Sequence, residues 1–176
     1  MAALQDDGGA RHLVAGTPLP DVVLPSTRGG KVALAQLSGL NVLYIYPWTG
    51  RPGMADPPNW DDIPGAHGST PQSQGFRDLH SDYAARGIGV YGISAQDTAY
   101  QSEFATRLDL PFPLLSDEAC GLQKALPLPT FETGGVTYLK RLTLVIEDAR
   151  ITRCVYPVSD PAAHAAQLLA TLPSIG

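Results

Sequence analysis

Apolar residues along the chain are spaced in two ways, and the change of spacing predicts alternating strands and helices. Residues 41–46 (NVLYIY) are rich in β-branched and aromatic side chains and are apolar on both faces. Such a run is typical of a central strand that is covered on both sides. Residues 88–94 show the same pattern. The other expected strands are a short one at 112–115 and a hairpin of 138–146 with 151–158 that turns at 147–150.

The longest expected helix starts after Gly68. Thr70 is a candidate N-cap with Pro71 at the first helical position, and Ser69 and Gln72 have the spacing of a capping box. One apolar stripe then runs along the helix, which should end at Gly87. The stripe consists of Phe76, Leu79 and Tyr83. Further helices are expected at 98–108 and 117–126, and a last one opens at Ser159, Asp160 and Pro161 and carries Leu168, Leu169 and Leu172.

The first part of the chain is predicted to hold a mobile tail and a hairpin. Residues 1–14 show no periodicity, which is typical of a flexible terminus. Two apolar runs, 22–24 and 31–34, then flank a turn at Thr27–Gly30. The Gly-Gly-Lys of this turn does not have the spacing of a phosphate-binding loop, so we interpret it as a hairpin turn.

A long loop follows the first central strand, which ends at Pro47. Residues 50–68 are rich in proline and glycine and have no periodicity. A loop of this length inside a compact domain is usually functional or disordered. We expect an ordered lid that Trp60 and Ile63 pin to the body. Because the loop leaves the carboxyl end of a strand, it lies where open α/β sheets carry their sites.

Composition and charge narrow the class of protein. The chain has 176 residues, 44% hydrophobic and 16% charged, so we expect one folded domain over 15–176. The net charge of −5 without a basic block argues against a nucleic-acid partner. No apolar run is long enough to cross a membrane, and the N-terminal residues do not resemble a signal peptide, which favours the cytoplasm. The element order predicts an α/β fold with one mixed central sheet, flanking helices and an N-terminal β-hairpin.

Candidate chemistry is sparse outside the helix that starts at residue 69. The two cysteines, Cys120 and Cys154, lack the spacing of a metal site or redox motif and are expected to be free thiols. A helix N-terminus stabilises an anion and would lower the pKa of a cysteine there, but this chain has Ser69.

Two other types of site have little support in the sequence. A serine hydrolase would need His67 or His80 as a base beside Ser69 or Ser73, and the Gly-x-Ser-x-Gly elbow is missing. Asp61, Asp62 and His67 do not have the spacing of a metal motif, so they are read as a solvated loop.

Several segments resemble the peroxiredoxins of the alkyl hydroperoxide reductase/thiol-specific antioxidant superfamily. The run TPLPDVVLPSTRGGKVALAQLSGLNVLYIYP looks like the opening of that domain, and PGAHGSTPQSQGFRDLH is similar to the active-site helix of the bacterioferritin-comigratory-protein, or peroxiredoxin Q, type. Shorter runs at 92–94, 112–117 and 139–146 follow in the family's order. The resemblance covers about residues 15–172 and implies a thioredoxin-like fold.

The resemblance also implies the site residues and shows where this chain departs from them. Ser69 stands at the position of the peroxidatic cysteine, and Gln74 stands where a resolving cysteine often lies. Pro47 matches the proline that closes the strand. Ala66 replaces the family's threonine, whose hydroxyl Thr49 would then supply. Arg141 matches the arginine that steadies the thiolate and the peroxide oxygens.

Two explanations of Ser69 are open: an engineered cysteine-to-serine change, or a natural loss that leaves a binding module which uses loop 50–68. We favour the first, because the rest of the site is retained. The implied parent reaction is reduction of hydrogen peroxide or an organic hydroperoxide without a bound cofactor.

The implied partners are the hydroperoxide and a thiol reductant, either a thioredoxin-like protein or a small thiol, acting on a monomer or homodimer. Cys120 is the preferred internal resolving thiol, because Cys154 lies inside an expected strand. Arg141 also has a purely structural explanation, an ion pair with Glu103 or Asp117.

Overall fold

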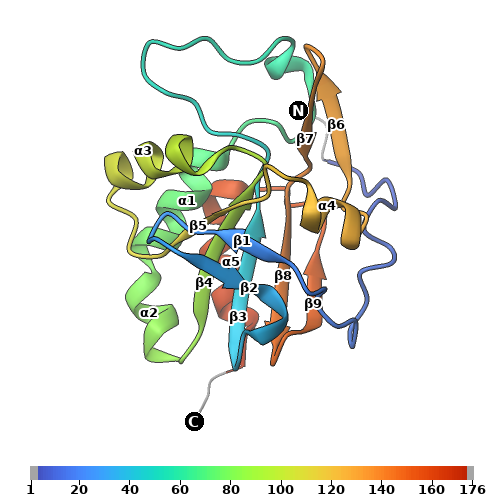
Figure 1. Cartoon of the computed structure of the whole chain (residues 1–176), viewed down its shortest axis with the longest axis vertical. Helices are drawn as coiled ribbons and strands as arrows, with labels where there is room; N and C mark the ends of the chain where they lie inside the picture. Colours follow the sequence, from blue (N-terminus) through green and yellow to red (C-terminus); the bar gives the residue numbers. More distant parts are fainter. Residues whose placement is uncertain (1–3, 174–176) are drawn as a thin grey trace.

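A five-stranded mixed sheet forms the centre of the computed structural model, which describes residues 4–173 (Figure 1). The strand order is β5-β4-β3-β8-β9. The central strand β3 (Leu40–Ile45) pairs in parallel with β4 (Gly89–Ser94), which pairs in parallel with β5 (Leu114–Ser116). On its other side β3 pairs antiparallel with β8 (Leu142–Glu147), and β8 with β9 (Arg150–Val155). The predicted mixed α/β architecture is therefore confirmed.

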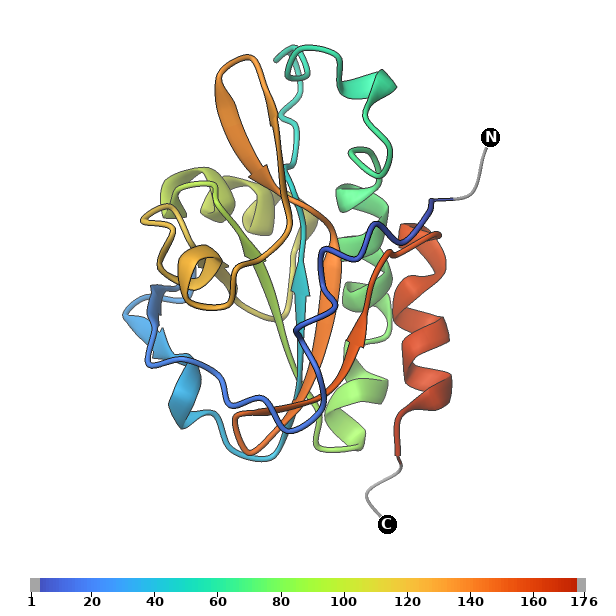
Figure 2. The same cartoon turned by 90° about the vertical axis from the view of Figure 1, so that its right-hand side faces the viewer.

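The two faces of β3 explain why its sequence has no polar side. Val42 and Tyr44 belong to one apolar core, and Leu43 and Ile45 to a second core on the opposite face. Helices α1 (Ser69–Asp78), α2 (His80–Ala85) and α5 (Pro161–Thr171) cover the first face. The hairpin of β1 (Val23–Pro25) with β2 (Lys31–Ala33) and the short helix α4 (Gly121–Ala125) cover the second (Figure 2).

Local signals set most element boundaries. Helix α3 (Thr98–Leu108) packs beside β5 and starts where the Oδ1 atom of Asp97 accepts a 2.7 Å hydrogen bond from the backbone N–H of Tyr100. Helix α5 starts in the same way at Asp160, followed by Pro161. Both Asp148 and Ala149 have positive φ, as a two-residue hairpin turn requires, so the expected turn between β8 and β9 is confirmed.

Three element predictions need correction. The helix predicted from 69 to 87 breaks at Leu79, which leaves helical geometry between α1 and α2. Thr70 is not the N-cap, because Gly68 takes that place and α1 starts at Ser69. The strand predicted over 138–146 is two strands, β7 (Val136–Leu139) and β8, separated by Lys140 and Arg141.

A second hairpin, which the sequence analysis did not assign, stands at the end of the sheet. Strand β6 (Thr130–Thr133) pairs antiparallel with β7. Figures 1 and 2 both show this hairpin extending past the sheet, beside loop 50–68. A short 3₁₀ helix in the loop, Trp60–Asp62, and another after β2, Leu34–Gln36, complete the described structure. No helix among residues 4–173 is long and apolar enough to cross a membrane.

Residues 4–14 lie against the body of the protein and are not the mobile tail that was expected. The Asp7 carboxylate accepts hydrogen bonds from Lys140 Nζ and the Tyr156 hydroxyl, each at 2.7 Å. The Leu13 side chain is buried in the second core, and a ring nitrogen of His12 contacts the carbonyl of Leu126 at 2.8 Å. These separate contacts hold the segment against the body of the protein, although its sequence has no periodicity.

Candidate active site

The first turn of α1 carries Ser69, the central candidate of the expected site. Ser69 is the first residue of the helix and is 4% exposed. Gly68 precedes it with φ +117°, and a Cβ atom there would lie 2.6 Å from Cγ of Pro161 on α5. Only glycine fits this close approach, so the sequence GS at 68–69 fixes the start of α1 against α5.

Arg141 binds this helix start from the junction of β7 and β8. Its Nη2 atom donates to Ser69 Oγ at 3.1 Å and to the three carbonyl oxygens of residues 65–67 at 3.2–3.3 Å. Its Nη1 atom donates to Gln72 Oε1 at 2.6 Å. Burial lowers the pKa of Arg141 to about 10, so the guanidinium stays charged at neutral pH. The serine hydroxyl therefore lies beside a buried cation and a helix N-terminus, both of which stabilise an anion.

The structural explanation of Arg141 as an ion-pair partner is wrong. Glu103 pairs with Arg51 and Arg107, and the Asp117 carboxylate accepts the backbone N–H groups of Leu122 and Gln123. The partners of Arg141 are one amide, one hydroxyl and backbone carbonyls, all from the loop and helix around Ser69. No carboxylate among the described residues neutralises its charge.

Pro47 and Thr49 follow β3, as the sequence analysis expected, and both are buried. The Thr49 hydroxyl, however, donates to Gln96 Oε1 at 3.3 Å, and no hydrogen bond joins it to Ser69 within residues 4–173. The Thr49 carbonyl accepts from Gln96 Nε2 and from the Tyr100 hydroxyl. Thr49 thus ties the start of loop 50–68 to the region around α3.

A hollow of about 370 Å³ lies over the start of α1, and we call it the Ser69 hollow. It is lined by Trp48, Thr49, Gly50, Arg51, Pro52, Asp56, Trp60, residues 66–71 and Arg107. Pro47 is not among these residues and borders a neighbouring depression instead.

The roof of the Ser69 hollow is the loop that the sequence analysis expected to be an ordered lid. Trp60 is 4% exposed and packs against the rings of Trp48, Phe131 and Tyr138, with centroids 5.2–5.6 Å apart. The carbonyl of Pro58 accepts a hydrogen bond from the Thr133 hydroxyl on β6. Ile63 is only half-buried, so Trp60 is the main anchor.

Comparisons with known proteins decide the family. The family model described as Redoxin matches residues 14–169. The chain belongs to the Redoxin family. It is 30% identical over 181 aligned positions to a peroxiredoxin Q, chloroplastic, of Oryza sativa subsp. japonica, covering 99% of this chain and 76% of that protein. It is 29% identical to a putative peroxiredoxin bcp of Coxiella burnetii, with 89% and 97% covered.

A solved structure gives the same answer for the fold. The crystal structure of peroxidoxin BcpB from Mycobacterium tuberculosis superposes with a TM-score of 0.75 at 27% identity, covering 94% of this chain and 99% of that one. The chain is therefore a peroxiredoxin of the Q, or bacterioferritin-comigratory, type, a class of thiol peroxidase, and the expected thioredoxin-like fold is confirmed.

Neither thiol of this peroxiredoxin lies at the Ser69 hollow. Cys120 precedes α4 with φ +61°, and its Sγ atom lies 3.7 Å from the Glu118 carbonyl. Cys154 lies on β9, and burial raises the pKa of its thiol to about 11. Both are half-buried and free, as expected.

The hydrolase alternative gains no support from the geometry of this peroxiredoxin. Ser73 shares a 3.0 Å hydrogen bond with the Tyr44 hydroxyl, and the ring of His80 lies beside Phe112. His67 bonds Asp61 at 2.5 Å instead of a serine. Asp61 and His67 form an exposed group with Asp56, whose ligand atoms lie within 4.8 Å of one another, and Asp62 is not part of this group.

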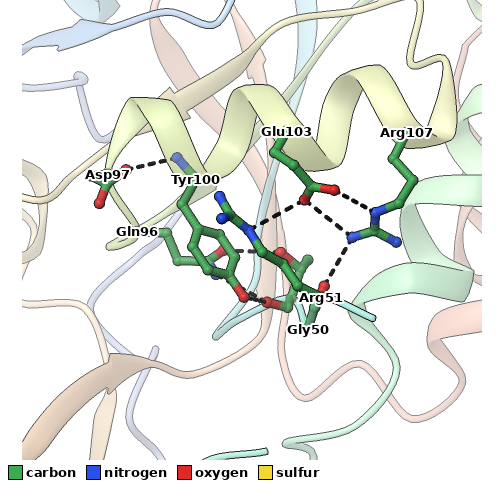
Figure 3. Close-up of polar contacts among 8 residues, drawn as sticks. Gly50, Arg51, Gln96, Asp97, Tyr100, Glu103 and Arg107 are labelled. Carbon is green, nitrogen blue, oxygen red and sulfur yellow. Dashed lines mark hydrogen bonds and ion pairs between the residues drawn. The ribbon is translucent and has the colours of Figure 1, made fainter. Parts of the chain in front are cut away.

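Two further parts of the site were not expected from the sequence. Gln72 is fully buried and holds Arg141, but its position in the sequence suggested only a capping residue. The second part is a polar cluster on α3 that fixes the loop backbone (Figure 3). The Tyr100 hydroxyl donates to the Thr49 carbonyl at 2.7 Å, and Arg107 Nη2 donates to the Gly50 carbonyl at 2.9 Å.

Proposed function

We propose that this peroxiredoxin is built to reduce hydroperoxides at position 69, and that serine at this position leaves the chain with little peroxidase activity. The contact of Arg141 Nη2 with Ser69 Oγ at the start of α1 carries the proposal. A sulfur atom in place of Oγ would lie beside a buried cation and the positive end of a helix. Both lower the pKa of a thiol and favour the reactive thiolate.

The reaction at a position-69 thiolate balances as a two-electron oxidation of sulfur. The sulfur attacks one peroxide oxygen, the S–O bond forms and the O–O bond breaks. The leaving alkoxide or hydroxide takes up a proton and departs as an alcohol or water. Arg141 and the free N–H groups of the first turn stabilise the negative charge that develops on the leaving oxygen. The resulting sulfenic acid condenses with a reductant thiol, which releases water and forms a disulfide.

Serine does not replace the thiolate in this step. Its hydroxyl stays protonated at neutral pH unless a general base lies beside it. Among residues 4–173 the hydrogen-bond partner of Ser69 Oγ is Arg141, which is a donor and not a base. The site therefore retains the elements that stabilise charge and lacks the nucleophile.

The Ser69→Cys variant tests the proposal. Its thiol should titrate below the ordinary value of about 8.5 and consume hydrogen peroxide, whereas the unmodified chain should not. Ser73→Cys is the matched control, because Ser73 is buried on the same helix but contacts Tyr44 and not Arg141. An ordinary pKa and no turnover in Ser69→Cys, or equal activity in both variants, would contradict the proposal.

The same variant identifies the thiol that resolves the sulfenic acid. Cys120 remains our internal candidate, because it precedes a five-residue helix that could open locally at modest cost, whereas Cys154 is fixed in a strand. Peptide mapping after one equivalent of peroxide should find a 69–120 disulfide if Cys120 resolves. A stable sulfenic acid with both native thiols still alkylatable would instead assign resolution to an external thiol, from a thioredoxin-like protein or a small thiol in the reducing cytoplasm.

A binding module without catalysis is the second candidate function. It is favoured by the fixed aromatic roof of the Ser69 hollow, which persists without a thiol, and by Gln74 at the position of the nearby resolving cysteine. The codon for residue 69 in the source gene separates the two: a cysteine codon supports a catalytic parent, and a serine codon supports the module.

A further inference from the structure

Two arginines beside the Ser69 hollow share a single carboxylate (Figure 3). Glu103 accepts from Arg107 Nε at 2.8 Å and pairs with Arg51 Nε at 3.4 Å. The pair with Arg107 keeps the pKa of Glu103 below its usual value, so the group is ionised. The side chains of Arg51, Arg107 and Glu103 together carry one unit of positive charge.

The terminal nitrogens of these arginines are largely uncommitted. Arg107 Nη2 donates to Glu103 and to the Gly50 carbonyl, but its Nη1 atom has no partner within residues 4–173. The same holds for both terminal nitrogens of Arg51, whose Cζ atom lies 4.1 Å from the ring centroid of Tyr100. The side chains of Arg51 and Arg107 are 32% and 31% exposed, so a ligand can reach both guanidinium groups.

The hollow that these arginines line has more room than hydrogen peroxide needs. Its volume of about 370 Å³ compares with roughly 30 Å³ for a water molecule, so an organic body fits beside the peroxide group. Trp48 and Trp60 supply an apolar wall for that body. The lining therefore combines the Ser69 end, an aromatic wall and a basic group.

Asp56 is the one acidic residue of the lining. It is exposed and belongs to the group with Asp61 and His67, whose ligand atoms lie within 4.8 Å of one another. Glu103 holds the arginines, and Asp56 has no ion pair with either of them in residues 4–173. Asp56 thus opposes an anionic ligand without neutralising the guanidinium groups.

We propose that the Ser69 hollow selects organic hydroperoxides that carry a carboxylate, and that Arg107 and Arg51 bind this carboxylate while the peroxide group faces position 69. The inference rests on the proposed function for its substrate, but the recognition of a carboxylate does not depend on catalysis. Arginine suits this role because its planar fork bonds both oxygens of a carboxylate.

The first test uses the chain as it is. The protein has two tryptophans, and both line the hollow, so intrinsic fluorescence reports a bound ligand. Cyclohexanecarboxylate should change the signal saturably, and the neutral, isosteric cyclohexanecarboxamide should bind at least about tenfold more weakly, as expected for loss of charge-assisted hydrogen bonds. Arg107→Gln and Arg51→Gln should each weaken binding of the acid, whereas Arg11→Gln, which removes the same charge elsewhere, should not.

The second test uses the Ser69→Cys protein. The ratio of kcat/KM for a cumene hydroperoxide with a para-carboxylate to that for its methyl ester should exceed one, and Arg107→Gln should lower this ratio about tenfold. Because Arg107 also holds Gly50, Arg51→Gln serves as the variant that leaves that contact in place.

The outcomes separate the two proposals. Equal binding of acid and amide, no binding of either, or equal effects of Arg107→Gln, Arg51→Gln and Arg11→Gln would overturn the carboxylate site. If Ser69→Cys reduces peroxides without preference for the acid, the proposed function stands and this inference fails. If the acid binds through Arg107 and Arg51 but Ser69→Cys is inactive, the carboxylate site stands and the peroxidase proposal fails.

Discussion

Arg141 Nη1 lies 2.6 Å from Gln72 Oε1, which joins the β7–β8 junction to the first turn of α1. Gln72 has no exposed surface, and its Nε2 atom has no hydrogen-bond partner in the described part of the chain. The amide therefore accepts from Arg141 and leaves its own donor unused. An amide oxygen at this place orients the guanidinium of Arg141 and leaves its positive charge intact, so Gln72 is a positioning residue.

Replacing Gln72 tests this role in the Ser69→Cys background. Gln72→Met removes the acceptor and should lower kcat/KM for hydrogen peroxide roughly tenfold, the size of one lost hydrogen bond to a charged group. Gln72→Glu keeps an acceptor but adds a negative charge, so it should raise the pKa of the position-69 thiol. Gln74→Met is the matched control, since Gln74 lies on the same helix and has no bond to Arg141. Equal losses in Gln72→Met and Gln74→Met would refute the role.

Arg141 itself should have a larger effect. In the Ser69→Cys protein, Arg141→Met should reduce kcat/KM about 10²-fold, the lower end of losses on removing one preorganised donor. The pKa of the thiol should rise in the same variant, because the nearest positive charge is gone. Arg141→Lys keeps the positive charge but loses the guanidinium group that bonds the carbonyls of residues 65–67. Its kcat/KM should therefore lie between that of the Ser69→Cys protein and that of the Arg141→Met variant. Unchanged kinetics in a folded Arg141→Met protein would assign the arginine a structural role only.

Gly68 is expected to be intolerant of substitution for a reason that differs from ordinary backbone strain. Both Gly68 and Gly53 have positive φ, but a Cβ at Gly68 would meet Pro161 at 2.6 Å, whereas Gly53 faces open space. Gly68→Ala should lower the free energy of unfolding by about 2 kcal/mol or more, and Gly53→Ala by about 1 kcal/mol. Urea denaturation of both variants measures the difference. Equal losses would mean that the contact of α1 with α5 relaxes freely.

His164 gives the fold a pH dependence that can be measured. The side chain is 4% exposed and bonds Thr143 Oγ1 at 2.8 Å, and burial, followed by the charges of Arg141 and Arg153, lowers its pKa from 6.5 to about 4. Because the unfolded chain binds this proton more readily, stability is complete above pH 6.5 and falls as the pH drops toward 4. The loss should reach roughly 2–3 kcal/mol.

His164→Gln removes the titrating group, so the variant should lose less stability than the parent between pH 6.5 and 4. Chemical denaturation at several pH values gives both curves, and the other ionisable groups contribute equally to each. Parallel curves for the parent and His164→Gln would show that His164 is not the cause.

The sequence predicted the elements whose signals are local. Helix α3 has the bounds expected for it, 98–108, because the apolar side of these residues repeats with helical spacing. The break at Leu79 was missed, since Phe76, Leu79 and Tyr83 continue the same spacing across it. Periodicity records which side of a helix is apolar and carries no information on where the axis bends.

The candidate site could be predicted from the sequence only in part. Ser69 and Arg141 are brought together as the family resemblance implied. The anchors of loop 50–68 were missed except for Trp60, because Arg107, Tyr100 and Arg141 bind backbone carbonyl oxygens. A carbonyl acceptor is present at every residue, so its use leaves no trace in the choice of amino acid.

The pairing of β3 with β8 has a consequence for how the chain acquires its structure during synthesis. The central strand, residues 40–45, is flanked on one side by residues 142–147, about a hundred positions later. Until that segment leaves the ribosome, β3 has an open edge that is apolar on both faces and available for pairing with other chains. Arg141 directly precedes β8, so the emergence of one short segment closes the sheet and delivers the cation to α1. A nascent chain released before this point would expose the open strand and lack the charge that organises the active site.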